Sequence, residues 1–74
     1  MATQEEPILR MLTPAELAKA LRLTERTLEN WRLRGYGPPY HRLGSQAHYK
    51  VVYNWRAVED WLGQRRAEQN ARPR

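Results

Sequence analysis

Two helix-start signals, close together in the sequence, limit what this chain can fold into more than any other feature. The tetrapeptide Thr-Pro-Ala-Glu at residues 13–16 has the form of a capping box. In such a box Thr13 and Glu16 satisfy free backbone N–H groups at the helix start, and proline takes the first helical position. Thr24 supplies a second N-cap shortly afterwards. The sequence therefore predicts a short helix over residues 14–21, a very short connection, and a second helix.

Apolar residues recur at helical spacing in both segments. They are Leu17, Ala18 and Leu21 in the first helix and Leu28 and Trp31 in the second. Such spacing places them on one face of each helix, so the two helices are expected to pack together with Leu23 at the corner between them. Gly35 can adopt the left-handed conformation in which many helices end. The arrangement is a helix-turn-helix, and an ordinary helical hairpin is the alternative.

The segment after Gly35 changes from helical to strand character. Pro38 and Pro39 cannot continue a helix, and residues 40–43 and 49–53 are rich in aromatic and β-branched side chains. A largely polar stretch with a glycine separates the two runs, so they predict a two-stranded β-hairpin. Because two strands alone are marginally stable in water, the hairpin must pack against the helices.

A third helix is predicted after the hairpin. Asn54 can cap it, Trp55 is its first residue, and Gly63 is expected to end it. The residues of this helix expected in the core are Val58, Trp61 and Leu62. The predicted fold class is α+β, a small winged helix-turn-helix with a two-stranded wing and a closing helix. The predicted organisation is a flexible tail over residues 1–11, one domain over 12–63, and a basic flexible tail over 64–74.

Composition favours a polyanionic partner. Thirteen Lys and Arg residues against eight Asp and Glu residues give a formal net charge of +5. Between residues 19 and 56 there are eight basic residues and only two acidic ones. An electropositive centre of this kind is typical of nucleic-acid binding, although a solvated basic surface has the same composition. The chain contains no Cys, which excludes a disulfide framework and a thiolate zinc site.

Other partners and activities find little support. No apolar run approaches the length of a membrane span, and the polar, acidic N-terminus is wrong for a signal peptide. His41 and His48 can face each other across the hairpin, but neither Cys nor a nearby carboxylate completes a metal site. Glu59 and Asp60 are neighbours and point to different sides of a helix. We therefore expect a cytoplasmic protein that is not an enzyme and has no cofactor, metal, membrane partner or small-molecule substrate.

Several runs of residues together point to a known family. Thr-Glu-Arg-Thr-Leu at residues 24–28 is followed by Trp31 and Gly35, and Pro-Pro-Tyr-His-Arg-Leu-Gly occupies residues 38–44. These runs resemble the MerR-like helix-turn-helix of phage excisionases, also called recombination directionality factors, and of small related regulators. The second run is similar to that family's first wing strand and turn. The resemblance extends over residues 12–62.

A winged helix-turn-helix implies binding of double-stranded DNA, with the second helix in the major groove and its N-terminal residues near base edges. The residues of this helix that point away from the core are Glu25, Arg26, Glu29, Asn30 and Leu33. We expect Arg26 to pair with guanine, and Asn30 to reach an adenine edge or a phosphate. The alternative for Arg26 is a surface pairing with Glu29 or Asn30.

Phosphate and wing contacts complete the expected interface. The phosphate contacts expected from the second helix are Thr24, Thr27, Arg32 and Arg34. Thr24 can equally be a helix cap, and the two arginines complement the helix dipole in any case. The wing contacts expected along the backbone or in the minor groove are Arg42, Ser45, Gln46, His48 and Lys50. Tyr53 comes nine positions after Gly44, so this wing is longer than the family pattern.

The resemblance implies a role in site-specific recombination. Excisionases line up as neighbouring copies on repeated sites, bend the DNA and direct an integrase towards excision. An integrase and further copies of the chain are thus implied partners, at the nucleoid in the cytoplasm of a bacterial host. A small transcriptional repressor with the same fold is an alternative. A protein-interaction module that uses Trp55 or the wing as its contact surface is an alternative of another class.

Overall fold

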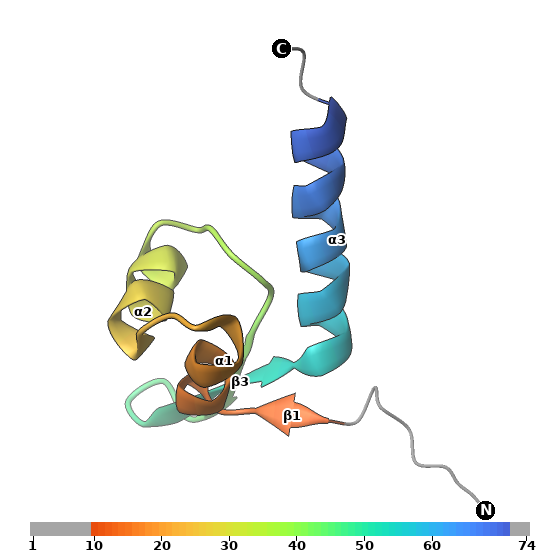
Figure 1. Ribbon diagram of the computed structural model, residues 1–74. Helices are drawn as coiled ribbons and strands as arrows, with labels where there is room; N and C mark the ends of the chain where they lie inside the picture. Colours follow the sequence, from red (N-terminus) through yellow and green to blue (C-terminus); the bar gives the residue numbers. More distant parts are fainter. Residues whose placement is uncertain (1–9, 72–74) are drawn as a thin grey trace, which may run out of the picture.

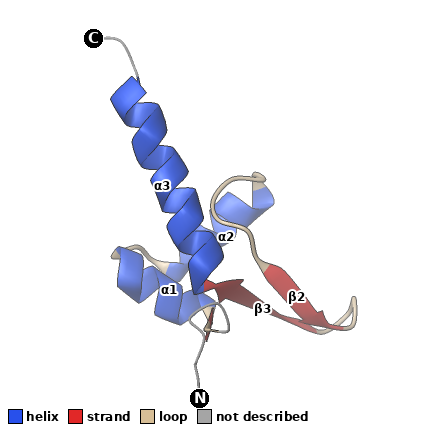
Figure 2. Ribbon diagram, turned by 90° about the vertical axis from the view of Figure 1, so that its right-hand side faces the viewer, coloured by secondary structure: helices blue, strands red, loops and turns tan. Residues whose placement is uncertain are grey.

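The computed structural model describes residues 10–71, which form three helices and an antiparallel three-stranded sheet (Figure 1). The elements in chain order are β1 (Met11–Leu12), α1 (Pro14–Leu21), α2 (Glu25–Leu33), β2 (His41–Gly44), β3 (Tyr49–Asn54) and α3 (Trp55–Ala71). The predicted α+β class and the winged helix-turn-helix arrangement are confirmed. Figures 1 and 2 both show α3 extending well beyond the rest of the domain.

Both predicted helix starts are confirmed by their hydrogen bonds. The Glu16 amide donates to Thr13 Oγ1 over 3.1 Å, and the Thr13 amide donates to Glu16 Oε1 over 2.9 Å, which completes the capping box of α1. In α2 the Thr27 amide donates to Thr24 Oγ1 over 3.1 Å. An N-cap of this kind stabilises a helix by about 1 kcal/mol. The caps thus fix where each short helix begins.

The turn between α1 and α2 depends on an arginine in a left-handed conformation. Arg22 has φ +60°, and the next amide, that of Leu23, donates to the Ala18 carbonyl over 2.8 Å. A left-handed conformation costs a residue with a Cβ about 1–2 kcal/mol. The Leu23 side chain packs against the core, which offsets this cost. The tight corner expected at Leu23 is therefore present.

The sheet has β3 at its centre and the order β1-β3-β2. The predicted hairpin is confirmed, with His41 opposite Val52 and Gly44 opposite Tyr49. Strand β1 was not predicted, and Met11, which was assigned to the N-terminal tail, pairs with Asn54 of β3. A strand of two residues shows no detectable periodicity, because its pairing depends on tertiary contacts. Residues 1–9 of the predicted tail lie outside the described residues.

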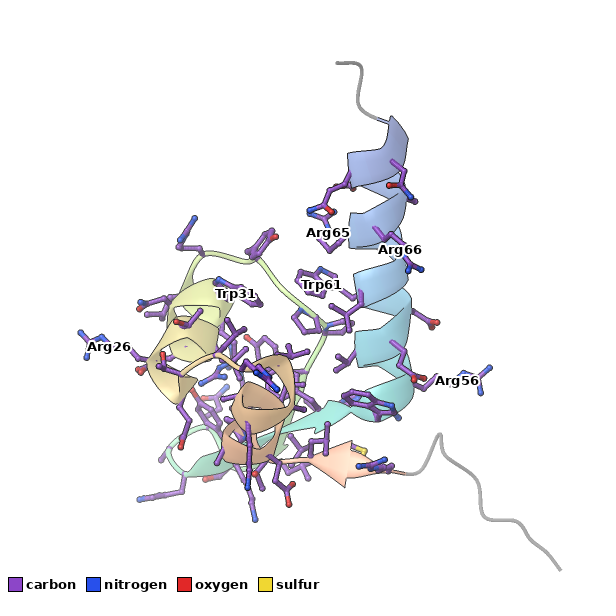
Figure 3. The ribbon with its side chains drawn as sticks, in the orientation of Figure 1. Arg26, Trp31, Arg56, Trp61, Arg65 and Arg66 are labelled. Carbon is purple, nitrogen blue, oxygen red and sulfur yellow. The ribbon has the colours of Figure 1, made fainter. Side chains whose placement is uncertain are left out.

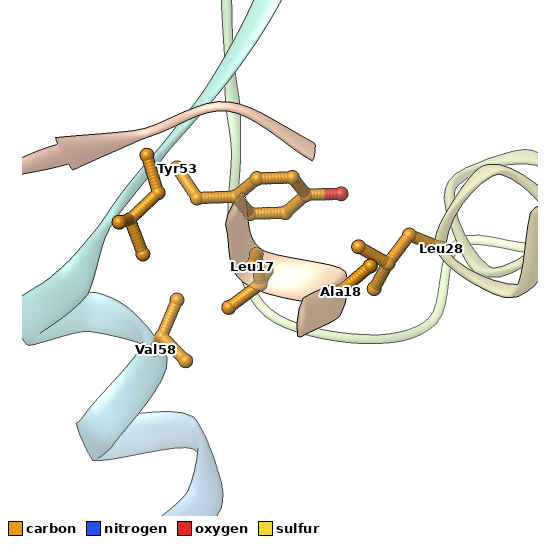
Figure 4. Close-up of a cluster of buried hydrophobic side chains, with 6 residues drawn as sticks. Leu17, Ala18, Leu28, Tyr53 and Val58 are labelled. Carbon is orange, nitrogen blue, oxygen red and sulfur yellow. The ribbon is translucent and has the colours of Figure 1, made fainter. Parts of the chain in front are cut away.

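The core lies where α1, α2, α3 and β3 meet (Figure 4). One large side chain from each element is fully buried: Leu17, Leu28, Val58 and Tyr53. Burial of an aliphatic side chain of this size stabilises the fold by about 1.5–3 kcal/mol. Trp31 of α2 packs against the cluster and is partly buried, as expected for the inward face of that helix. The core thus holds α2 and the base of the hairpin in a fixed relation.

Helix α3 does not end at Gly63 as predicted but continues to Ala71. Gly63 has no positive φ, so its backbone continues the helix, and good helix formers follow it. Arg65 forms an ion pair with Glu68 over 2.6 Å. The predicted helix end is therefore wrong, and residues 64–71 are helical rather than a tail; residues 72–74 lie outside the described residues. The expected Asn54 cap is confirmed, because Asn54 Oδ1 accepts from the amide of Arg56 over 2.8 Å and from the amide of Ala57 over 3.3 Å.

An aromatic cluster joins the end of α2 to α3. The ring centres of Trp31, Tyr36 and Trp61 lie 5.2 to 5.7 Å from one another, and the Arg65 guanidinium lies over both Trp61 and Tyr36. The chain bends past this cluster at Gly37, where φ is +99° and a Cβ would lie 2.8 Å from the Trp31 ring. Only glycine fits there without displacing the ring.

Candidate nucleic-acid interface

The face of α2 opposite the core is exposed and polar. Glu25, Arg26, Glu29 and Asn30 are all exposed, whereas Leu28 is completely buried. Figure 3 shows Arg26 projecting from α2 away from the rest of the domain. Arg26 and Asn30 lie one turn apart, so they share a row along the helix. Within residues 10–71 neither side chain has an ion pair or hydrogen-bond partner, so the alternative surface pairing of Arg26 is not formed.

The two threonines at the start of α2 act together. Thr24 Oγ1 accepts from the Thr27 amide, and the two hydroxyl oxygens lie 3.0 Å apart. The alternative in which Thr24 is the helix cap is therefore confirmed. One hydroxyl donates to the other, which leaves the second hydroxyl proton available for an anion at the helix N-terminus.

Arg32 and Arg34, predicted together as phosphate contacts, have different environments. Arg32 Nη1 donates to the hydroxyl of Tyr53 over 2.8 Å, and its guanidinium lies 5.8 Å from the centre of the Tyr40 ring. The half-buried Arg32 thus connects α2 to β3 and to the segment before β2. Arg34 follows α2 as its C-cap and has an exposed side chain. The structure therefore separates the two residues.

The predicted wing residues divide between the two faces of the hairpin and its tip. The register pairs Arg42 with Val51 and Leu43 with Lys50, so Arg42 and Lys50 lie on opposite faces. At the tip, the amide of Ser45 donates to the His48 carbonyl over 3.0 Å, and the His48 amide donates to Ser45 Oγ over 3.1 Å. These bonds close the longer turn. The side chains of Gln46 and His48 are exposed.

Arg42 lies on the hairpin face that adjoins α2. Its guanidinium lies 5.1 Å from the centre of the Tyr49 ring. A hydrogen bond with the Tyr40 side chain raises the pKa of Arg42 above its usual value, as do the nearby Tyr40 and Tyr49 hydroxyls. A concavity of about 200 Å³ separates this face from the last turns of α2 and is bordered on the helix side by Glu29 and Leu33.

Two exposed residues beside this concavity had no role in the sequence-based interface. Leu33 is 78% exposed and Tyr49 is 49% exposed. Helical periodicity places Leu33 on the same side of α2 as Arg26 and Asn30, so its exposure was predictable. The position of Tyr49 was not, because it depends on the register of the hairpin and on how the hairpin meets α2.

The described part of the chain also bears on metal and membrane binding. Within residues 10–71 no three His, Cys, Asp or Glu side chains gather closely enough to hold a metal ion. His41 lies opposite Val52 and not opposite His48. None of the helices in this part of the chain combines the length and the apolar character needed to cross a bilayer.

Two capped helices joined by a tight turn, the second with a free polar face beside a basic hairpin, define a DNA-binding helix-turn-helix protein. A family model described as a helix-turn-helix domain matches residues 11–66, which is most of the chain. The chain therefore belongs to this helix-turn-helix domain family, and the partner that such a domain implies is double-stranded DNA. Searches of curated proteins and of solved structures found no significant match.

Proposed function

We propose that this protein binds double-stranded DNA sequence-specifically as an excisionase-like architectural factor. In this role it occupies repeated sites, bends the DNA and directs an integrase towards excision. The observation that carries the DNA-reading part is the free row of Arg26 and Asn30 on α2, because a guanidinium and a carboxamide are the side-chain groups that pair bidentately with guanine and adenine. The MerR-like pattern of the sequence supports the excisionase part.

The size of the interface supports binding by several copies. A single module of this kind covers about 600–1,000 Å² of protein surface, which gives modest affinity alone. Neighbouring copies on repeated sites raise occupancy through their combined contacts. We propose that further copies of the chain and an integrase are its partners at the nucleoid of a bacterial cell.

Selection of preferred sequences from random duplexes tests sequence reading by α2. We expect Arg26→Ala to relax the preference at one base position and to weaken binding by about 1–3 kcal/mol. Arg56→Ala is the matched control, because it removes the same charge from α3, on the far side of the domain from α2 (Figure 3). Selection of the same sequence with equal affinity by the Arg26→Ala protein would contradict the assignment.

Footprinting on the selected sequence tests the architectural part. Phased repeats within an attachment site, each protected by a copy of the protein, are the expected result. Protection of a single operator inside a promoter would replace this role with that of a small transcriptional repressor. Failure to shift any duplex in a gel, together with salt-insensitive binding of a protein partner, would favour a protein-interaction module.

A further inference from the structure

The junction between α2 and the hairpin has a surface of unusual composition. Leu33 stands on the helix side, and Tyr49 and Arg42 stand on the hairpin side of the same concavity. An exposed leucine alone is ordinary. Here an exposed leucine lies across the concavity from a tyrosine ring and from the guanidinium beside that ring. Such a surface offers apolar contact and a fixed positive charge within one small area.

The Arg42 guanidinium lies beside an aromatic ring at the junction. It lies 5.1 Å from the centre of the Tyr49 ring, and Tyr40 is close enough to raise the pKa of Arg42 above its usual value. Both tyrosines border the same concavity as Arg42. Tyr49 also shares its face of the hairpin, because Tyr49 lies two residues before Val51, the residue paired with Arg42. Stacking on the Tyr49 ring limits the rotamers of Arg42, so less conformational entropy is lost when it binds an anion.

The two other charged groups at the junction act differently from Arg42. The half-buried Arg32 already donates to the Tyr53 hydroxyl over 2.8 Å. Glu29 is exposed, borders the same concavity, and has no ion-pair partner in residues 10–71. Its carboxylate repels phosphate, so an anion is favoured on the Arg42 side of the concavity and disfavoured on the helix side. The charges thus define one position for a single phosphate.

We propose that the junction binds one deoxyribose–phosphate unit of the DNA strand that separates two adjacent grooves. The phosphate lies on Arg42, and the sugar packs between Leu33 and Tyr49. This inference rests on the proposed function, since the strand passes over the junction when α2 lies in the major groove and the hairpin follows the next groove. The apolar CH groups of the sugar match the leucine and the ring, and the phosphate oxygens match the guanidinium.

A scan of single phosphates tests this assignment. In the duplex selected above, each phosphate near the site is replaced in turn by an uncharged methylphosphonate, and affinity is measured for each duplex. We expect one position at which the unmodified protein loses affinity about tenfold and the Arg42→Ala protein loses none, because the lost contact is a charge-assisted hydrogen bond. Lys50→Ala is the matched control on the opposite face of the hairpin, and it should keep the full loss at that position.

The salt dependence of binding tests the apolar contact of Leu33 and Tyr49 with the sugar. Leu33→Ala and Tyr49→Ala should weaken single-site binding with an unchanged salt dependence, whereas Arg42→Ala should lower the slope of log affinity against log salt by about one. Circular dichroism checks that these variants with exposed substitutions remain folded.

Equal sensitivity of the Arg42→Ala and unmodified proteins at every phosphate would overturn the inference. So would a Leu33→Ala variant that loses only cooperativity between copies on a two-site duplex, since this surface would then contact protein. Absence of binding to any duplex would instead remove the proposed function itself, and the two failures are therefore distinguishable.

Discussion

Helix α2 and the β2–β3 hairpin both border the candidate interface, but they differ in anchoring and in charge. Leu28 anchors α2 in the centre of the core, whereas every residue of β2 is exposed and the hairpin is buried only at its base, through Val52 and Tyr53. The exposed charges of α2 balance, because its two glutamates are matched by one exposed arginine in the helix and one at its C-cap. The hairpin carries Arg42 and Lys50 and no acidic residue.

This difference indicates a division of labour. A rigid helix with balanced charge gains little from general attraction to phosphate, so its contribution depends on which bases it meets. A less anchored hairpin with a net positive charge attracts any duplex and contributes affinity with little dependence on sequence. We therefore expect substitutions in the helix to alter sequence preference and substitutions in the hairpin to alter affinity for any duplex.

The largest expected effect concerns anchoring. Leu28→Ala should lower the free energy of unfolding by about 2–5 kcal/mol, because it leaves a cavity in the core. Leu43→Ala on the exposed strand β2 is the matched control and should change it by no more than about 0.5 kcal/mol. Urea denaturation followed by circular dichroism measures both. Equal losses would show that the hairpin is anchored as firmly as the helix.

The next effect separates sequence reading from general attraction. The double variant Arg42→Ala/Lys50→Ala should weaken binding to all duplexes alike and lower the salt slope by about two. Arg26→Ala should cost about 1–3 kcal/mol on the preferred sequence and much less on unrelated DNA. Fluorescence anisotropy at several salt concentrations measures both quantities. A hairpin variant that loses affinity only on the preferred sequence would contradict this division of labour.

A smaller effect tests the connection between the two elements. Tyr53→Phe removes the hydroxyl that accepts from Arg32, and we expect a loss of about 1 kcal/mol in unfolding free energy, reduced by the partial exposure of Arg32. Tyr53 is 1% exposed and cannot touch DNA in this structure. Any effect of Tyr53→Phe on DNA affinity must therefore act through the position of the hairpin. A double-mutant cycle that combines Tyr53→Phe with Arg42→Ala should show a coupling of about 0.5 kcal/mol or more in DNA affinity. Strict additivity would mean that Arg32 does not hold the hairpin against α2.

The smallest effect concerns the charge balance of α2. Glu29→Gln should raise affinity for all duplexes by about 0.5 kcal/mol at low salt, because it removes an exposed negative charge beside phosphates. The increase should disappear as salt screens the interaction. Glu59→Gln on α3 serves as the control for a change in net charge alone. An equal increase in both proteins would show that the position of Glu29 is unimportant.

Much of the fold was predictable because its signals are local. The caps at Thr13, Thr24 and Asn54 each involve groups no more than three residues apart, so sequence alone identifies them. The hairpin follows from a change of composition after the Pro38-Pro39 pair. Strand β1 could not be predicted, because its two residues pair with β3 only once the chain has folded.

One error came from giving a single signal too much weight. Gly63 was interpreted as a helix end, yet Arg65 four residues after Trp61 lies on the same face and extends the helix through its contacts with the aromatic cluster. Arg32 and Arg34 were both predicted to contact phosphate because of their charge, and the structure gives them different environments. The position of Arg32 four residues after Leu28 already indicated the inward-facing side of α2, where the structure places it against Tyr53.

We propose above that the outward face of α2 and the adjoining hairpin jointly bind the duplex. A titration of isotopically labelled protein with the selected duplex, followed by NMR amide shifts, tests it residue by residue. We expect the largest changes over residues 24–34 and 41–50, and small changes over residues 63–71 of α3. Changes concentrated on the distal half of α3, with residues 24–34 unaffected, would contradict it.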